Sequence, residues 1–261
     1  MAATHLVFQS NIGRQKPESI VNKSTRCPFC DRNELAEILA EEGSILLVKN
    51  KFPVLEDTCM TVLIETDVCH SELSEYPRDH LHRLIRFGVA QWEAMEQSGE
   101  YASVIFYKNH GPLSGGTIRH PHMQIVGLNQ VDYREHVTAE QFEGLVIDRS
   151  PGVAFNISTR PRMGFYELNV VLTDREQIDR MADYIQMAAH YFLHHFHAKC
   201  DSYNLFFYRL ENGNIAAKIL PRFVTTPLFV GYSIPQVASR IPEVVAQLQE
   251  LYLAQEKHRT P

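Results

Sequence analysis

The chain has 261 residues, of which 44% are hydrophobic and 21% charged, a composition typical of a globular protein with one large or two smaller domains. Its net charge of -6 argues against broad binding to nucleic acids or anionic membranes. No window approaches the ~20 apolar residues of a membrane helix and no signal-peptide pattern is present, so we expect a cytoplasmic protein. Five scattered cysteines disfavour a disulfide framework.

The N-terminal segment, residues 1–26, is polar and irregular. Its basic residues include Arg14, Lys16, Lys23 and Arg26. A solvated arm is the favoured interpretation, although basic residues ahead of a phosphate site can also bind phosphates. Cys27 and Cys30 then form a Cys-x-x-Cys pair. A thioredoxin-like redox pair would follow a strand, which is missing here, so we interpret the pair as half of a tetrahedral zinc site.

The first half of the chain then alternates between helix and strand patterns. Residues 34–41 have a helical pattern, and strands are expected at 44–49 and 60–66. Apolar residues recurring every three or four positions predict a helix over residues 77–97. A strand at 103–107 and the strand that carries His122 complete this half.

A polar stretch follows, and it places a domain boundary near residue 148. The second half has strand patterns at 153–158 and 165–172, a helix at 176–197, strands at 204–210 and 218–224, and a closing helix at 235–255. Both halves share the order strand, strand, helix, strand, strand. This repetition predicts an α+β fold of two tandem units, residues 1–148 and 149–261, built on antiparallel sheet with flanking helices.

A glycine-containing loop and a His-x-His-x-Gln pattern form the most informative stretch. The loop consists of Ser114, Gly115, Gly116 and Thr117. In a strand, His120, His122 and Gln124 share one face, while the loop amides can close around an anion. This combination suits phosphate chemistry, with an imidazole as nucleophile and a carboxamide as a hydrogen-bond donor. Two partly buried histidines beside an ordinary hairpin loop are the alternative.

Four potential zinc ligands emerge along the first half: Cys27, Cys30, His70 and His120. Two thiolates and two imidazoles form a closed tetrahedral shell with no open position, which is typical of a structural site. Such a site would tie the N-terminal arm to the strand that bears His120. It would thereby position His122 without touching the substrate.

Five motifs in this order resemble the galactose-1-phosphate uridylyltransferases. They are Cys27-Pro28-Phe29-Cys30, Asn50-Lys51-Phe52-Pro53-Val54-Leu55, His70, Asn109 with Gly111, and His120-Pro121-His122-Met123-Gln124. These enzymes, with ADP-sugar and dinucleoside-polyphosphate phosphorylases, form a branch of the histidine-triad superfamily. The motifs cover residues 1–130, and the match is looser at 218–222 and 228–232.

The resemblance implies a histidine-triad-like fold in which only the N-terminal half is catalytic and the C-terminal half is degenerate. His122 corresponds to the nucleophile that forms a nucleotidyl-histidine, and Gln124 to the glutamine that binds the transferred phosphoryl group. Asn109 and Thr117 correspond to phosphate-lining positions, and Asn50 to part of the nucleoside pocket. Lys51 replaces an acidic residue frequent in the family.

The resemblance also implies a structural zinc ion as the cofactor and a homodimer, with Lys218 and Arg222 as candidates for completing the partner's site. A second metal site is not expected, because no histidine stands between His197 and His258. The expected substrate is a nucleotide-sugar or a related nucleoside polyphosphate. The leading hypothesis is a nucleotidyltransferase with a phosphorylated acceptor. The alternatives are a phosphorylase or hydrolase of ADP-sugars or dinucleoside polyphosphates, and a non-catalytic, zinc-stabilised nucleotide-binding protein.

Overall fold

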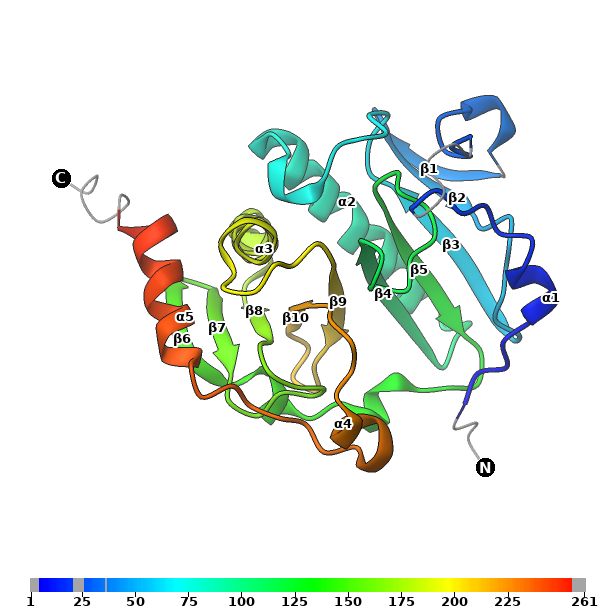
Figure 1. The fold of residues 1–261 in the computed structure, drawn as a ribbon. Helices are drawn as coiled ribbons and strands as arrows, with labels where there is room; N and C mark the ends of the chain where they lie inside the picture. Colours follow the sequence, from blue (N-terminus) through cyan, green and yellow to red (C-terminus); the bar gives the residue numbers. More distant parts are fainter. Residues whose placement is uncertain (1–4, 21–25, 36, 255–261) are drawn as a thin grey trace. The chain divides into compact units, whose positions relative to one another are not determined.

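The computed structural model describes residues 5–20, 26–35 and 37–254 (Figure 1). Its contacts divide the chain into two compact units, Met1–His136 and Val137–Pro261. The expected boundary near residue 148 falls inside a strand, Gly144–Ser150, which is paired along most of its length. Because that pairing belongs to the second unit, the division comes earlier in the chain. No helix in the described ranges is both long enough and apolar enough to cross a membrane.

Unit 1 is an antiparallel sheet with the strand order β1-β2-β3-β5-β4. Its strands are β1 (Ile38–Glu42), β2 (Ile45–Lys49), β3 (Thr58–Ile64), β4 (Ser103–His110) and β5 (His122–Leu128). A short helix α1 (Ser10–Gly13) lies in the N-terminal arm, and the long helix α2 (Arg78–Gln97) connects β3 to β4. As expected, the sheet is antiparallel and flanked by helix.

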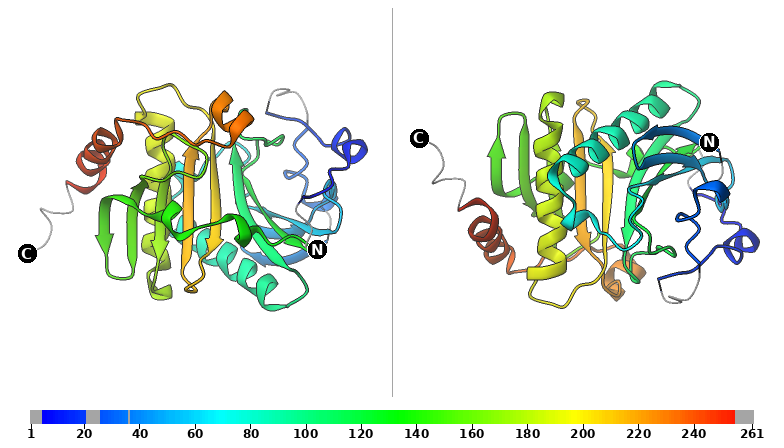
Figure 2. Two further views of the ribbon diagram at one scale, coloured as in Figure 1. Left: turned by 90° about the horizontal axis from the view of Figure 1, so that it is seen from below. Right: turned by 90° about the horizontal axis from the view of Figure 1, so that it is seen from above.

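Unit 2 is also an antiparallel sheet, with the order β9-β10-β8-β7-β6. Its strands are β6 (Gly144–Ser150), β7 (Val153–Ser158), β8 (Leu168–Leu172), β9 (Tyr203–Arg209) and β10 (Ile215–Pro221). The helices are α3 (Ile178–His190), α4 (Pro227–Tyr232) and α5 (Ile241–Leu248). Figure 2 shows α3 running along the sheet, where it contacts β7, β8 and β10.

Helix α2 packs closely on one face of the unit 1 sheet. A Cβ added to Gly88 would lie 2.7 Å from the Phe106 ring and 3.3 Å from Leu63, so the absence of a side chain at Gly88 permits this approach. Leu63 pairs with Met123 across β3 and β5, and both side chains therefore face α2. His122 and Gln124, the neighbours of Met123, consequently point to the opposite face, toward the N-terminal arm.

Two strands differ from the sequence expectation. The helical pattern at residues 34–41 is wrong, because Ile38–Glu42 forms β1 and only Arg32–Glu34 makes a 3-10 turn. Strand β6 was not expected at all. Both are terminal strands in the order of their units, and most of their residues are exposed or half-buried, so they lack the apolar alternation that identifies a buried strand. Pairing with β2 and β7 determines their conformation instead.

Candidate functional site

His122 is the first residue of β5, and one hydrogen bond fixes the state of its ring. Its Nδ1 lies 2.8 Å from the carbonyl oxygen of His120. A carbonyl can only accept, so Nδ1 carries the proton and donates it. The neutral ring therefore keeps the lone pair of Nε2 available as a nucleophile or an acceptor.

The surroundings of His122 favour this neutral form. The residue is buried, with 9% of its surface exposed. Burial, followed by the positive charge of Lys108, lowers the pKa of His122 to about 4, and its hydrogen bond to the His120 backbone offsets only part of this. The Phe29 ring packs edge-on against it, with 5.3 Å between the ring centroids. Phe29 thus supports the ring through the Cys27–Cys30 segment.

Four potential metal ligands lie together beneath His122. The ligand atoms of Cys27, Cys30, Cys69 and His120 are all within 4.8 Å of one another. The Nε2 of His120 donates to the Thr66 carbonyl at 2.8 Å, so the lone pair of Nδ1 faces the sulfur atoms of Cys27 and Cys30, 3.5 and 3.6 Å away. A hydrogen bond on the non-ligating nitrogen is the usual way in which proteins orient a metal-binding histidine.

The fourth member of this group corrects the sequence expectation. His70 is exposed and lies outside the group, whereas its neighbour Cys69 lies inside it. The segment is a turn, in which the Ser71 amide donates to the Val68 carbonyl, and consecutive side chains in such a turn point in different directions. The donor set is therefore three thiols and one imidazole, rather than two of each.

The chemistry of these donors fits a bound cation. Burial raises the pKa of the Cys27 thiol, but the hydrogen bonds to His120 and to the Phe29 amide outweigh it and lower the pKa to about 6. Burial and the neighbouring thiols raise the pKa of Cys69 to about 12. Adjacent thiolates repel one another, and a metal ion held among them removes that repulsion. A Cys3His set is one of the closed tetrahedral sets found in structural metal sites.

The loop before β5 is held by its own side chains and by the arm. Gly115 has a φ of +88°, in the left-handed region that favours glycine. Ser114 is buried, donates to the Gly111 carbonyl at 2.7 Å and accepts from the Gly116 amide. Ser19 in the arm donates its amide to the Thr117 carbonyl at 2.8 Å.

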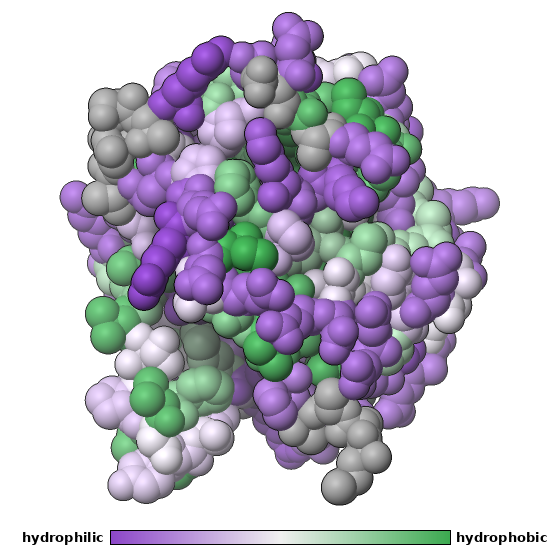
Figure 3. All heavy atoms as spheres, turned by 90° about the vertical axis from the view of Figure 1, so that its right-hand side faces the viewer, coloured by the Kyte–Doolittle hydropathy of each residue, from purple (hydrophilic) through white to green (hydrophobic). Residues whose placement is uncertain are grey.

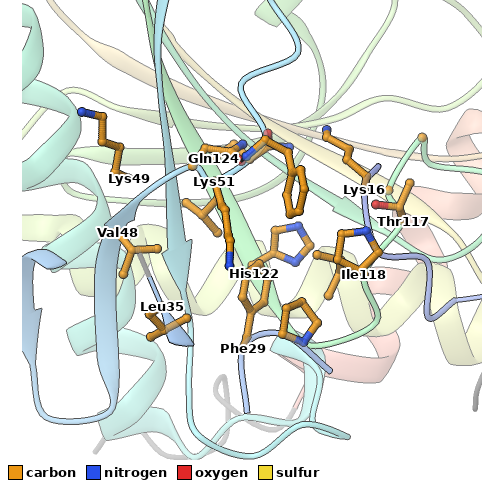
Figure 4. Close-up of a pocket in the computed structure, with 17 residues that line it drawn as sticks. Lys16, Phe29, Leu35, Val48, Lys49, Lys51, Thr117, Ile118, His122 and Gln124 are labelled. Carbon is orange, nitrogen blue, oxygen red and sulfur yellow. Dashed lines mark hydrogen bonds between the residues drawn. The ribbon is translucent and has the colours of Figure 1, made fainter. Parts of the chain in front are cut away.

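A pocket that is partly open to solvent lies in front of His122 (Figure 4), with about 770 Å³ of empty space when the adjoining solvent is included. Of the residues expected to contact substrate or to react, it is lined by Asn50, Gly115, Gly116, Thr117, His122 and Gln124. Its apolar wall comprises Phe29, Leu35, Val48, Val62 and Ile118. The cationic residues are Lys16, Lys49 and Lys51.

Two expected phosphate-binding residues have a supporting place instead. Asn109 and Ser114 are not among the lining residues. A Cβ on Gly116 would lie 3.3 Å from the Cβ of Asn109, so the Asn109 side chain packs against the loop at Gly116 and supports its position. The Asn50 side chain accepts a hydrogen bond from the Phe52 amide at 2.8 Å. This bond stabilises the turn that carries Lys51. Lys23, one of the basic arm residues, lies outside the described residues.

Lys218 is buried rather than available to a partner. It forms an ion pair with Glu167 at 2.7 Å and donates to the Gln141 carbonyl at 2.8 Å. Arg222 donates to the Asn204 side chain at 3.1 Å. Both residues have local partners within unit 2, and this disfavours the expected role of Lys218 in a second subunit's site.

Comparisons with known proteins place this geometry in a family. The models "Domain of unknown function (DUF4931) N-terminal domain" and "C-terminal domain" match residues 8–131 and 134–253. A crystal structure of a DUF4931 family protein from Bacillus cereus ATCC 10987 is 47% identical and covers 83% of this chain and 100% of that one, with a TM-score of 0.76. None of the curated proteins matches the chain.

More distant structures share the fold. A uridylyltransferase is 14% identical, with a TM-score of 0.70, and the match covers 90% of this chain and 93% of that one. An ADP-glucose phosphorylase from Arabidopsis thaliana with bound ADP-glucose is 15% identical, with a TM-score of 0.67, and the match covers 92% and 93%. At the level of fold, these matches confirm the resemblance found in the sequence motifs.

Proposed function

This chain belongs to the DUF4931 family, and we propose that its N-terminal unit is a nucleotidyltransferase that forms a nucleotidyl-histidine on His122. The observation that carries the proposal is the hydrogen bond from Nδ1 of His122 to the His120 carbonyl, because it leaves Nε2 free to attack. A neutral imidazole is a competent nucleophile near pH 7. The fold neighbours named uridylyltransferase and ADP-glucose phosphorylase support the same class of reaction.

The reaction proceeds in two in-line steps. In the first, Nε2 of His122 attacks the α-phosphorus, the new P–N bond forms, and the P–O bond to the remainder of the substrate breaks with its electron pair. In the second, an oxygen of the acceptor attacks the same phosphorus, the P–N bond breaks, and the neutral ring is restored. Gln124 and the loop amides stabilise the charge on the non-bridging oxygens in both steps.

We propose zinc as the ion held by Cys27, Cys30, Cys69 and His120, since three thiolates and an imidazole match its preference for sulfur and nitrogen in tetrahedral geometry. When bound, the ion supplies structural constraint rather than reactivity. His120 is two residues from His122, and its backbone carbonyl accepts the hydrogen bond from Nδ1 of His122. The metal site therefore fixes the carbonyl that orients the nucleophile.

The acceptor in the second step determines whether the protein is a transferase, a phosphorylase or a hydrolase. A hexose 1-phosphate acceptor makes it a hexose-1-phosphate uridylyltransferase-like enzyme acting on nucleotide-sugars. Inorganic phosphate makes it a phosphorylase, and water a hydrolase. The open pocket beside His122 supports a second substrate that enters after the first product leaves, which predicts ping-pong kinetics.

The test is incubation of the full chain with α-³²P-labelled UDP-glucose, ADP-glucose and diadenosine tetraphosphate. We expect acid-labile label on the protein, and its discharge by galactose 1-phosphate, by phosphate or by buffer alone identifies the acceptor. A protein that binds these nucleotides but never carries label contradicts the proposal and supports a non-catalytic nucleotide-binding role.

We further propose that the two units are tandem versions of one histidine-triad-like unit, with the second one degenerate, and that the protein is a homodimer. The shared strand order supports the first statement. The boundary expected at residue 148 becomes 136 in this proposal. Sedimentation equilibrium tests the second statement, and a monomer at all concentrations contradicts it.

A further inference from the structure

The walls of the His122 pocket carry an unbalanced positive charge. Three lysines line it, Lys16, Lys49 and Lys51, and no aspartate or glutamate does so within the described ranges. None of the three ammonium groups forms an ion pair with another described residue. On a chain with a net charge of -6, such a local excess of lysine is a feature of the site rather than of the composition. It favours an anionic ligand.

The three lysines differ in where their side chains point. In Figure 4, the Lys51 side chain extends toward the His122 ring from one side, the Lys16 ammonium lies on the other side of the pocket, and Lys49 points away. Lys16 is half-buried, and burial lowers its pKa. A desolvated ammonium without a carboxylate partner gains most from a ligand anion. In Figure 3, hydrophilic side chains surround smaller apolar areas on the face that carries the N-terminal arm.

The number of cationic groups exceeds what a nucleotide-sugar needs. The phosphate under attack lies against Gln124 and the loop amides, and a nucleotide-sugar adds only one more phosphate. Sugar and ribose hydroxyls are bound by carboxylates, which this wall lacks among its described residues, whereas a basic side chain at a ribose site accommodates a phosphate. One cation is thus left for a further phosphate group.

We propose that the substrate of this site is a nucleotide with at least three phosphate groups, and that Lys51 is the specificity-determining residue that binds the additional phosphate. This inference rests on the proposed function of the same pocket. Lys16, beside the glycine loop, binds the phosphate that leaves with the second part of the substrate. The additional phosphate either extends the polyphosphate chain or is attached to the ribose, and both present the same chemistry to an ammonium group.

Equilibrium binding to the full chain separates this inference from turnover. The probes are α,β-methylene analogues, in which His122 cannot cleave the bridge: those of ADP, of ATP and of ADP-glucose, with the uridine set in parallel. A second pair, the α,β-methylene analogues of ADP and of adenosine 3′-phosphate 5′-diphosphate, tests a third phosphate at the ribose position. Calorimetry gives each dissociation constant at two salt concentrations, because charge-dominated binding weakens as salt rises.

We expect a third phosphate, at one of the two positions, to strengthen binding by at least about tenfold. In Lys51→Met this preference falls to about twofold or less, whereas Lys49→Met, whose side chain points away, retains most of it. Lys199→Met, in unit 2 and exposed, retains all of it. Met keeps an unbranched side chain as far as the ε position and lacks only the ammonium group, so the variants differ chiefly in charge.

Three results overturn the inference. They are equal affinity for ligands with two and three phosphates, a preference that survives in Lys51→Met, or equal losses in Lys51→Met and Lys49→Met. Each of them leaves the nucleotidyl-histidine proposal in place, because the label-transfer experiment does not depend on charge selectivity. If label transfer fails while the binding preference for the third phosphate is normal, the proposed function is wrong and this inference about the ligand still holds.

Discussion

Strands β5 and β10 occupy the same place in sheets of the same strand order, yet only β5 places a histidine and a glutamine in the wall of the pocket described above. In unit 1, His122 pairs with Ile64, the last residue of β3. In unit 2, Ile215 pairs with Leu172, the last residue of β8. Ala217 pairs with Val170, and Val170 pairs with Phe155, whose ring stacks on Tyr184 of α3, so Ile215 and Ala217 face the helix. The face of β10 that points away from α3 carries Ala216, Lys218 and Leu220 instead, all of them buried. The matching face thus holds two polar side chains beside a pocket in unit 1 and a buried, ion-paired lysine between apolar residues in unit 2.

The difference extends to the segments around each strand. Before β5 stands a glycine loop that the N-terminal arm holds in place, with four potential metal ligands beside it. Before β10 stands a short turn at Gly213, and Ala216 and Lys218 on the matching face are buried. The two units therefore share a sheet topology, and the proposed chemistry depends on the loop, the arm and the donor group that only unit 1 has among the described residues.

The largest expected effect is that of replacing His122, the proposed nucleophile. We expect His122→Asn to abolish nucleotidyl transfer, a loss on the order of 10³-fold or more, because no other group can form the covalent intermediate. The matched control is His194→Asn in unit 2, an exposed histidine outside the pocket, which should transfer at the wild-type rate. Comparable losses in both variants would contradict the assignment.

The next largest expected effect is on metal binding, when one of the four potential ligands is replaced. Cys69→Ser should reduce the bound metal from about one ion per chain to a small fraction, since a missing ligand weakens a closed tetrahedral site strongly. His70→Ala should leave the metal content unchanged, because His70 lies outside the donor group. Elemental analysis of freshly purified protein measures both. The opposite result would restore His70 as the ligand.

Sequence reasoning singled out His122, which lines the pocket, but missed Cys69 by a single position. The His-x-His-x-Gln pattern works because alternation along β5 follows from strand geometry alone. The identity of the fourth potential ligand depends on how the turn at residues 66–71 directs each side chain, and no periodicity encodes that. Strands β1 and β6 were missed for a related reason: exposed strands carry polar residues, and only pairing with a neighbour identifies them.

Both units also bury an ion pair, and we expect the loss of stability on breaking it to be similar in the two units. Glu65 contacts Lys108 in unit 1 and Glu167 contacts Lys218 in unit 2, with all four residues at most 1% exposed. Lys108→Met or Lys218→Met should each destabilise its unit by about 3–5 kcal/mol, because a buried carboxylate loses its partner. Chemical denaturation measures this.

The double variant Glu65→Gln with Lys108→Met removes both charges and should recover part of the stability lost in Lys108→Met. If the double variant is as unstable as the single one, the loss comes from packing and not from an uncompensated charge.

The smallest effect concerns the glycine loop. Gly115→Ala should cost about 1–2 kcal/mol, because its φ of +88° disfavours a side chain although no atom lies within 4 Å of the new Cβ. Gly99→Ala, with a φ of +71° and equally open surroundings, should lose similar stability. Only Gly115→Ala should weaken nucleotide binding, measured by calorimetry. Equal nucleotide affinities in the two variants would show that the loop does not contribute to phosphate binding.

Locating the covalent adduct tests the central claim most directly. The full chain, incubated with a nucleotide substrate and quenched in base, is digested and mapped by mass spectrometry for a nucleoside monophosphate. We predict an acid-labile adduct on the peptide that carries His122, and phosphorus NMR should show a P–N bond to Nε2. An adduct on another residue, or turnover with no adduct under conditions that preserve phosphoramidates, would contradict the account.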